Sequence, residues 1–377
     1  MEGGFFMKDM DKKEHLIILS HPLCITRLDV IIGLLRNEKN IKPRCIPQII
    51  AAFAMALLTL PAVLFEGFFN RRAKNMRGPV FIMGHWRSGT TLVQYLMAQD
   101  KQFGNFDPVF AFSYNYYHLL GWLFHFLTKG QLSETRPQDN MRLSLDLPLE
   151  EYMVFANIEK DSLYPVNYFP QSFDRYMNNS YWQDLPAKKA EKLKKKYDRM
   201  LGKCTRHNAG KRLLLKSPDN TGRILPLYEM YPDAKFINIY RNPYTVIRST
   251  LHLYESTFSM WALQETPSRE KLENSIIENF ARMYENYFAA IEKLPENSVY
   301  EIRFEDFEKD PVPYLKEAYS VLGLDGFEEA KEGFERYMKE EEGYKKNKFD
   351  YPDGLKRKIN ARLGFYFEHY GYPTEEV

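Results

Sequence analysis

The segment PVFIMGHWRSGTT, residues 79–91, decides how the rest of the chain is interpreted. Its first part, Pro79–Met83, is a short apolar run of the kind that forms a buried strand. Gly84 follows, then Gly89 after four intervening residues, and then Thr90–Thr91 at the start of an apparent helix. A strand, a loop with two glycines and a helix form a phosphate loop, in which backbone N–H groups and the helix N-terminus surround an anion. The segment therefore predicts an anion site next to a β-strand.

The loop differs from that of nucleotide-hydrolysing proteins at one position. Thr90 stands where those loops have a lysine that reaches the terminal phosphates. Arg87 supplies a positive charge inside the loop, and the hydroxyl groups of Ser88, Thr90 and Thr91 add hydrogen-bond donors. Such a loop is poorly equipped for a triphosphate, which disfavours a kinase, but it suits a smaller anion such as a phosphosulfate.

Further β runs occur after the loop, over residues 212–216, 234–240 and 298–303, with helical stretches between them. Strands that alternate with helices predict a parallel sheet covered on both faces. We therefore expect an α/β fold: a P-loop-type core with a central parallel sheet flanked by helices, and helical N- and C-terminal additions. We divide the chain into an N-terminal extension, 1–77, and a main domain, 78–377.

A second candidate site follows the run 234–240. Arg241 stands at the end of this strand, and the next helix begins with Asn242 as N-cap and Pro243 as its first residue. Ser249 lies two turns into that helix. Open α/β sheets bind ligands at the C-terminal ends of their strands, so we expect Arg241 and Ser249 to converge on one phosphate.

Composition excludes several classes of protein. Lys and Arg number 52 against 50 Asp and Glu, and a net charge of +2 argues against a nucleic-acid binder. The three cysteines are too few and too scattered for a disulfide scaffold or a zinc cluster, which favours a reducing compartment. The charged start of the chain lacks the apolar region of a secretory signal peptide, so we expect a cytoplasmic protein.

The extension contains one long uncharged run, the 21 residues from Cys45 to Phe65. Three interpretations stay open: an interfacial or re-entrant helix attached to a membrane, a buried helix packed on the main domain, and a single membrane span. Pro61 would interrupt a regular span, and basic residues on both sides give no clear orientation. We favour the first interpretation.

Three of these segments together resemble a known family. RSGTTL at 87–92, LLKSP at 214–218 and the Arg241 to Ser249 unit are similar to the sulfotransferases that use 3′-phosphoadenosine-5′-phosphosulfate (PAPS). The resemblance covers residues 79–325 and is greatest to the bacterial-type branch, which includes tyrosylprotein and carbohydrate enzymes. It implies that PAPS is the donor and that adenosine 3′,5′-bisphosphate is the product. It also implies that Arg87, Ser88, Gly89, Thr90 and Thr91 hold the 5′-phosphosulfate, and that Arg241 and Ser249 hold the 3′-phosphate.

The sequence departs from the family pattern in two places. His85-Trp86 stands where the family usually has a proline before the arginine, and the first 75 residues match none of the motifs.

Sulfuryl transfer also requires a base for the acceptor hydroxyl and cations for the leaving phosphate. Lys216, at a strand end, is an additional candidate cation. The segment 146–152 resembles a Pro-x-Glu-(Asp/Glu) unit of related enzymes, so Glu150 is our first candidate base and Glu151 the next; a solvated acidic helix start is the alternative. His85 is a rival base beside the loop, although packing is the commoner role of a lone histidine. None of the apolar β runs is followed by an acidic residue of the kind that holds a metal in nucleotide-binding loops, so the sequence does not imply a metal.

The acceptor is less defined. Of 57 aromatic residues, ten fall within 103–127, and together with 45–65 they favour an apolar alcohol such as a sterol or lipid. A glycan acceptor and a non-catalytic, membrane-attached nucleotide-binding protein stay open as alternatives. The basic segment 344–348 is either a cover for the nucleotide or a solvated cluster.

Overall fold

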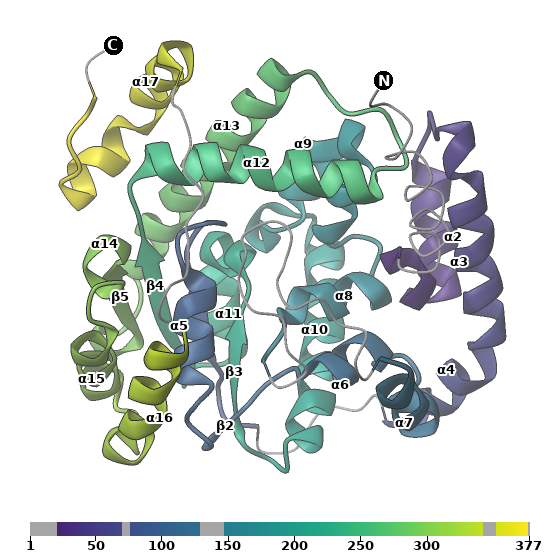
Figure 1. Cartoon of the computed structure of the whole chain (residues 1–377), viewed down its shortest axis with the longest axis horizontal. Coiled ribbons are helices and arrows are strands. Elements are labelled where there is room, and N and C mark those ends of the chain that lie inside the picture. Colours follow the sequence, from purple (N-terminus) through teal and green to yellow (C-terminus); the bar gives the residue numbers. More distant parts are fainter. Residues whose placement is uncertain (1–20, 70–75, 129–146, 342–351, 376–377) are drawn as a thin grey trace, which may run out of the picture.

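Five parallel strands form the centre of the molecule in the computed structural model, which describes residues 21–69, 76–128, 147–341 and 352–375 (Figure 1). The strands are β1 (Val80–Met83), β2 (Phe103–Gly104), β3 (Arg212–Lys216), β4 (Lys235–Tyr240) and β5 (Val299–Arg303). Their order in the sheet is β2-β3-β1-β4-β5, and every neighbouring pair is parallel. The expected α/β fold with a central parallel sheet is confirmed.

Both faces of the sheet are buried at its central strands, which explains the continuous apolar runs of β1 and β3. Along β1, Val80 and Ile82 belong to one hydrophobic core, and Phe81 and Met83 belong to the other. This alternation is the period of two that a strand imposes on its side chains. The bounds of the four longer strands lie within one residue of those predicted. β2 is a two-residue edge strand that the sequence analysis did not predict.

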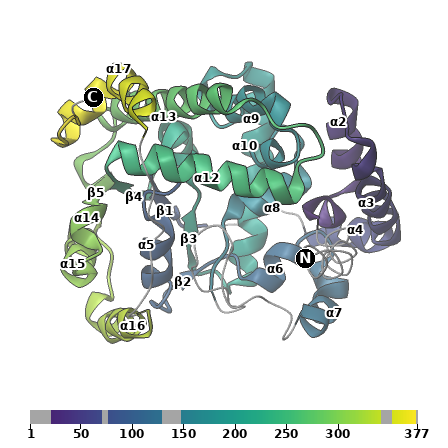
Figure 2. The same ribbon diagram turned by 45° about the horizontal axis from the view of Figure 1, so that its top comes forward.

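Helices cover the two faces unequally (Figures 1 and 2). The smaller core lies under α5 (Thr90–Met97), α14 (Phe304–Phe307), α15 (Pro311–Leu322) and α16 (Phe327–Glu340). The larger core includes residues of α6 (Pro108–Ser113), α8 (Glu151–Ile158), α9 (Phe173–Asn178), α10 (Ala187–His207), α11 (Ile224–Met230), α12 (Pro243–Trp261), α13 (Arg269–Ile291) and α17 (Asp353–Tyr370). α7 (Tyr117–Thr128) packs at its margin.

Within residues 21–69 the N-terminal segment contains the α-helices α2 (Leu28–Asn37), α3 (Ile46–Leu58) and α4 (Leu60–Glu66), which lie at one side of the molecule (Figure 1). Val30, Ile31 and Leu34 of α2 are buried in the same core cluster as Phe81 of the sheet. The side of α2 that carries these residues therefore packs as part of the main body.

The uncharged run 45–65 is two helices with a 54° bend between them. At the bend, the Thr59 hydroxyl donates to the Met55 carbonyl at 2.8 Å, a contact that often bends helices. Pro61 is tolerated because it stands in the first turn of α4, where its missing N–H has no helical partner to lose. No single described helix is long and apolar enough to cross a bilayer; the bent pair Pro43–Leu58 and Leu60–Phe69 meets that test of length and composition only when its two parts are taken together.

Candidate active site

The candidate site lies where three strands end. β1 ends at Met83, which is level with Asn238 of β4, and Lys216, the last residue of β3, is level with Ile82 of β1. Parallel strands end at a common edge, so the loop after β1, Lys216 and Arg241 all lie at one edge of the sheet. Ligands bind at this edge in open α/β proteins.

The loop between β1 and α5 has a conformation that requires its glycines. Gly84 and Gly89 have φ of 135° and 103°, values that other residues rarely adopt. A Cβ on Gly84 would lie 2.2 Å from the Ile239 carbonyl oxygen, and one on Gly89 would lie 2.3 Å from the Phe304 ring. The Gly84 N–H also donates to the Thr221 hydroxyl at 2.8 Å. The loop is thus held closely against β4 and its neighbours.

The loop presents donors suited to an anion. α5 begins at Thr90, directly after Gly89, so its first N–H groups lie at the helix N-terminus beside the loop. Ser88 and Thr90 are buried and Thr91 is half-buried. Arg87 lies in the left-handed region at φ 71°, a backbone state that is uncommon outside functional sites. The donor set, with its hydroxyls, backbone amides and arginines, has the chemistry that a phosphosulfate requires.

The two predicted motifs meet in the fold. The Arg87 Nε donates to the Ser249 hydroxyl at 2.9 Å, and an Arg241 guanidinium N–H donates to the Arg87 carbonyl at 3.1 Å. The Arg241 guanidinium also lies 4.1 Å from the centre of the Phe304 ring. Residues more than 150 positions apart are therefore joined into one cationic cluster at the sheet edge. The Asn242 side chain caps α12 as predicted, because it accepts from the Tyr244 N–H at 3.0 Å.

The C-terminal helix α17 contacts the backbone of this cluster. The sequence analysis did not predict that contact. The Tyr366 hydroxyl donates to the Arg241 carbonyl at 3.0 Å and lies 3.3 Å from the Arg241 N–H. Glu305 accepts from the Asn242 N–H at 2.9 Å. The predicted basic segment 344–348 lies outside the described residues.

The first candidate base is paired with the additional cation. The Lys216 ammonium donates to the Glu150 carboxylate in an ion pair that joins the end of β3 to the start of α8. The Lys216 side chain is 2% exposed and that of Glu150 is 24% exposed, so the carboxylate is the partner that solvent or a substrate can reach. The preceding residue, Leu149, is fixed by the Phe106 carbonyl at 2.8 Å and by Gln94 of α5 at 3.4 Å. Gln94 thereby connects the carboxylate segment to the helix of the phosphate loop.

The neighbouring Glu151 is turned into the protein. It is fully buried, and its Oε1 accepts from Asn220 at 2.8 Å and from the Tyr197 hydroxyl at 3.1 Å. A buried ion pair between Arg223 and Asp219, at 2.9 Å, lies close by. Burial raises the pKa of Glu151 to about 7. This environment is suited to a structural carboxyl group rather than to one that meets a substrate.

Glu151 makes the stability of the protein depend on pH. Between about pH 4.5 and 7 the unfolded chain loses this proton while the folded chain keeps it, so folding stability falls as pH rises through that window. Glu151→Gln removes the titration. We expect the free energy of unfolding of this variant, relative to that of the wild type, to rise from pH 5 to pH 8 by up to about 3 kcal/mol. Thermal unfolding at the two pH values checks this, and a stability relative to the wild type that stays constant or falls from pH 5 to pH 8 would contradict it.

His85 is fully enclosed behind the loop. Its ring centre lies 4.8 Å from that of Phe280 and 5.2 Å from that of Trp86, and its Nδ1 lies 3.0 Å from the Trp86 carbonyl, which fixes the proton on that nitrogen. Burial lowers the pKa of His85 to about 4, so the ring is neutral at physiological pH. This geometry favours a packing role over that of a base.

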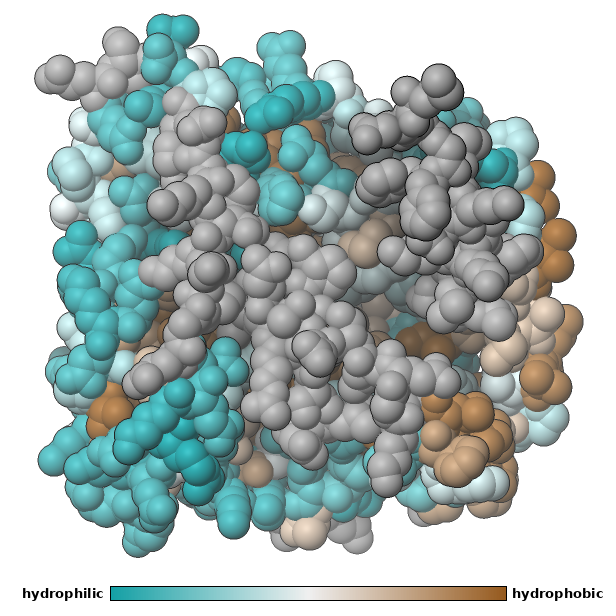
Figure 3. Space-filling view, in the orientation of Figure 1, coloured by the Kyte–Doolittle hydropathy of each residue, from teal (hydrophilic) through white to brown (hydrophobic). Residues whose placement is uncertain are grey.

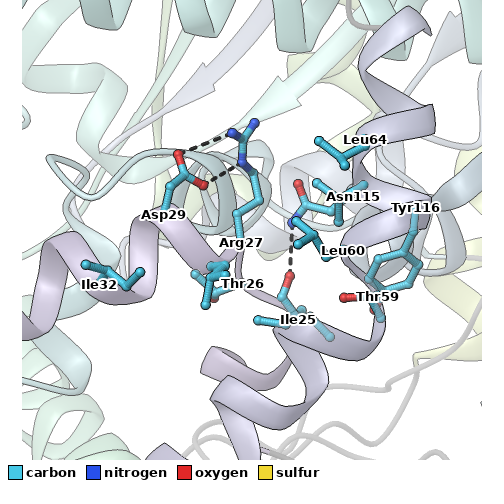
Figure 4. Close-up of a pocket in the computed structure, with 13 residues that line it drawn as sticks. Ile25, Thr26, Arg27, Asp29, Ile32, Thr59, Leu60, Leu64, Asn115 and Tyr116 are labelled. Atoms are coloured by element: carbon cyan, nitrogen blue, oxygen red, sulfur yellow. Dashed lines mark hydrogen bonds and ion pairs between the residues drawn. The ribbon is translucent and has the colours of Figure 1, made fainter.

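The aromatic segment 103–127 divides into two parts. Phe106, Phe110 and Tyr114 are buried in the larger core, whereas Trp122 and Phe126 are exposed on α7. A cavity of about 310 Å³ borders the segment between α2, the α3–α4 bend and the start of α7 (Figure 4). None of its 13 lining residues belongs to the phosphate loop or to the strand ends described above.

Comparisons with known proteins agree with this geometry. A sequence model of the sulfotransferase family matches residues 79–329. The omega-hydroxy-beta-dihydromenaquinone-9 sulfotransferase Stf3 of Mycobacterium bovis is 29% identical over 294 residues, which are 78% of this chain and 75% of that protein; the protein of the same name from Mycobacterium tuberculosis gives the same values.

Two solved structures share the fold. The sulfotransferase STF9 of Mycobacterium avium aligns with a TM-score of 0.68 at 14% identity, over 92% of this chain and 91% of that one. The sulfotransferase STF1 of Mycobacterium tuberculosis aligns with a TM-score of 0.61 at 17% identity, over 88% and 90%.

Proposed function

This chain belongs to the sulfotransferase family and is a transferase enzyme, and on that basis we propose that it moves a sulfuryl group from PAPS to the hydroxyl group of a lipid alcohol. The observation that carries the proposal is the contact between the two phosphate motifs. Arg87 bonds to Ser249, and Arg241 bonds to the Arg87 backbone, so the expected binding groups for both ends of the donor share one edge of the sheet.

The donor would be held by groups of this chain alone. The loop from Arg87 to Thr91 and the N-terminus of α5 would bind the 5′-phosphosulfate. Arg241 and Ser249 would bind the 3′-phosphate. PAPS supplies the sulfuryl group, and adenosine 3′,5′-bisphosphate leaves. We propose a direct in-line transfer that uses no metal.

Glu150 is the base that the geometry favours. A general base must be within hydrogen-bond reach of the proton that it takes, and the Glu150 carboxylate is partly exposed beside the loop helix. Lys216 holds this carboxylate in place and brings a positive charge to the strand end, where charge on a leaving phosphate needs stabilisation. Glu151 and His85, the other candidates, are both buried against protein groups.

Two observations support a lipid acceptor over a glycan. The curated relatives named above act, by their names, on a menaquinone derivative with a terminal hydroxyl group. The chain also exposes large apolar side chains on α3, α4 and α7, a surface at which an apolar substrate can be met.

We further propose that the protein works in the cytoplasm and touches a membrane through residues 45–65. All three cysteines are buried free thiols, which suits a reducing compartment. The outer side of the bent helix pair carries large apolar residues such as Ile50, Leu58 and Leu64. A lipid substrate would be met at that surface.

A binding measurement separates this proposal from a kinase. We expect adenosine 3′,5′-bisphosphate to bind tightly without metal and Mg-ATP to bind much more weakly, because Thr90 replaces the lysine that reaches a terminal phosphate. Titration calorimetry with both ligands measures this. Tight Mg-ATP binding with no affinity for the bisphosphate would overturn the assignment.

A further inference from the structure

The large apolar side chains that the described residues leave exposed fall in only two segments, 46–68 and 119–127. They are Ile46, Ile50, Leu57, Leu58, Leu64, Phe65, Phe68, Leu119, Trp122, Phe126 and Leu127. In the space-filling view they form brown surface at the right edge and lower right, where Figure 1 places α3, α4 and α7 (Figure 3). We call this set the apolar face. Exposed apolar residues that are scattered singly need no explanation, but these are gathered on three helices, of which α4 packs against both α3 and α7, and such a group marks an interaction site.

The two sides of the helices α3 and α4 differ in the size of their side chains rather than in polarity. Apart from the ion-paired Glu66, their buried positions hold small alanines, Ala52, Ala56 and Ala62, while their outer positions hold large residues such as Leu58, 75% exposed. A surface helix of a water-soluble protein buries its large apolar side chains and exposes polar ones. The opposite arrangement indicates that the outer side meets an apolar medium.

Both ends of this bent pair are attached to the protein body. Before α3, the Lys42 N–H donates to the Leu263 carbonyl at 2.8 Å. At the end of α4, Glu66 forms a buried ion pair with Lys203 of α10. Removing one member of a buried pair is costly, so this attachment is firm. A segment held at both ends on one body, with a 54° bend between its two helices, is better placed to lie along a bilayer surface than to cross it.

The second segment, α7, is joined to the first by the same buried carboxylate. Glu66 accepts from the His118 N–H at 3.0 Å and lies 2.7 Å from the His118 ring nitrogen, and Phe69 stacks on that ring at 3.8 Å. The stretch 108–128 is a second run of 21 residues without Asp, Glu, Lys or Arg. The end of α4 and the start of α7 are therefore fixed to each other, and their exposed apolar side chains belong to one rigid part of the protein.

Between residues 30 and 66 the exposed charge has one sign, and Asp29, just before this stretch, is paired with Arg27. From Val30 to Glu66 the only acidic residues are Glu38 and Glu66, and both are buried, whereas Arg36, Lys39 and Arg44 are exposed. A cationic rim beside apolar side chains suits a surface with anionic headgroups above an apolar interior. A second copy of this chain would bring the same positive rim against itself.

We propose that α3, α4 and α7 together dock the enzyme on one leaflet of an anionic bilayer, with the apolar face inserted and no segment crossing. α7 is a full partner in this contact, and Trp122, 70% exposed, lies at the interface. The contact does not depend on the acceptor, so it is tested without donor or acceptor, and its failure would leave the proposed transfer reaction untouched.

The test uses the full chain and vesicles of phosphatidylcholine, with and without phosphatidylglycerol. We expect flotation with the anionic vesicles, weaker flotation with neutral ones, and loss of binding at high salt. Leu58→Glu and Trp122→Glu are each expected to weaken binding by at least about tenfold, whereas Ser320→Glu, the same change of charge on exposed α15, should not. Because both target residues are exposed, thermal unfolding should be unchanged.

Fluorescence gives a second measurement. Brominated lipid should quench tryptophan emission in the wild type, and Trp122→Phe should remove most of that quenching. No binding to anionic vesicles, or binding that neither Glu variant alters, would overturn the proposal. Binding lost only with Leu58→Glu would remove α7 from it. Concentration-dependent dimers without vesicle binding would assign the face to a second copy.

Discussion

Glu150→Gln is expected to lower turnover by about 10²-fold or more and to leave the affinity for adenosine 3′,5′-bisphosphate unchanged. The amide keeps the size of the carboxylate and can still accept from Lys216, so the start of α8 should remain in place. It cannot take a proton from a hydroxyl group. Donor binding should persist because Arg87, Arg241 and Ser249 contact one another without Glu150.

The comparison with Glu151→Gln makes this test specific. The two residues are adjacent and receive the same chemical change, but the Glu151 carboxyl group is buried against Asn220 and Tyr197. We expect the second variant to act on stability, as described above. Single-turnover rates measure the difference. A rate that falls with Glu151→Gln and not with Glu150→Gln would move the base to Glu151.

Arg87→Ala is expected to weaken binding of adenosine 3′,5′-bisphosphate by about 10²-fold and to reduce transfer to background. The Arg87 guanidinium group joins the loop to Ser249 and brings a positive charge to the phosphate site, and the variant loses both, whereas the Arg87 carbonyl that accepts from Arg241 remains. Loss of one member of a buried charged contact, here the arginine and an anionic group of the donor, costs about 2–5 kcal/mol, and a hundredfold change lies in the lower part of that range.

Two further variants define the role of Arg87. Arg87→Lys keeps the charge but loses the Nε donor to Ser249, so we expect an intermediate loss. Arg336→Ala, the same change to Ala at an exposed arginine on α16, should bind as the wild type does. Titration calorimetry of the three variants measures this. Wild-type affinity in Arg87→Ala would exclude the loop arginine from the donor site.

The fold was predictable because its signals are local. Val80 to Met83 is apolar on both sides of a strand, and the glycine spacing after it identifies a tight loop by itself. The N-cap Asn242 and the following Pro243 likewise predict the start of α12 from two adjacent residues. The bend within 45–65 has a local origin, because the Thr59 hydroxyl bonds to the Met55 carbonyl and Pro61 begins a new helix. The angle of the bend could not be predicted, because it also depends on how α3 and α4 pack on the rest of the protein.

The supports of the site were not predictable, because they depend on contacts between distant segments. Gln94 meets Leu149 across 55 positions, and Tyr366 meets Arg241 across 125. The pairing of Lys216 with Glu150 is of the same kind, although both residues were candidates from their local context. The periodicity of a single sequence does not show which of its many glutamines, tyrosines or lysines will contact a given residue of a distant segment.

The most direct test is transfer itself. The purified chain would be incubated with radiolabelled PAPS and, separately, with a long-chain lipid alcohol, a sterol, a phenol and a sugar, and the products would be identified by mass. We predict that label moves to the hydroxyl group of the lipid alcohol or sterol, and that Glu150→Gln and Arg87→Ala abolish this transfer. Label on the sugar alone, or no transfer to any hydroxyl group while adenosine 3′,5′-bisphosphate still binds, would contradict the account.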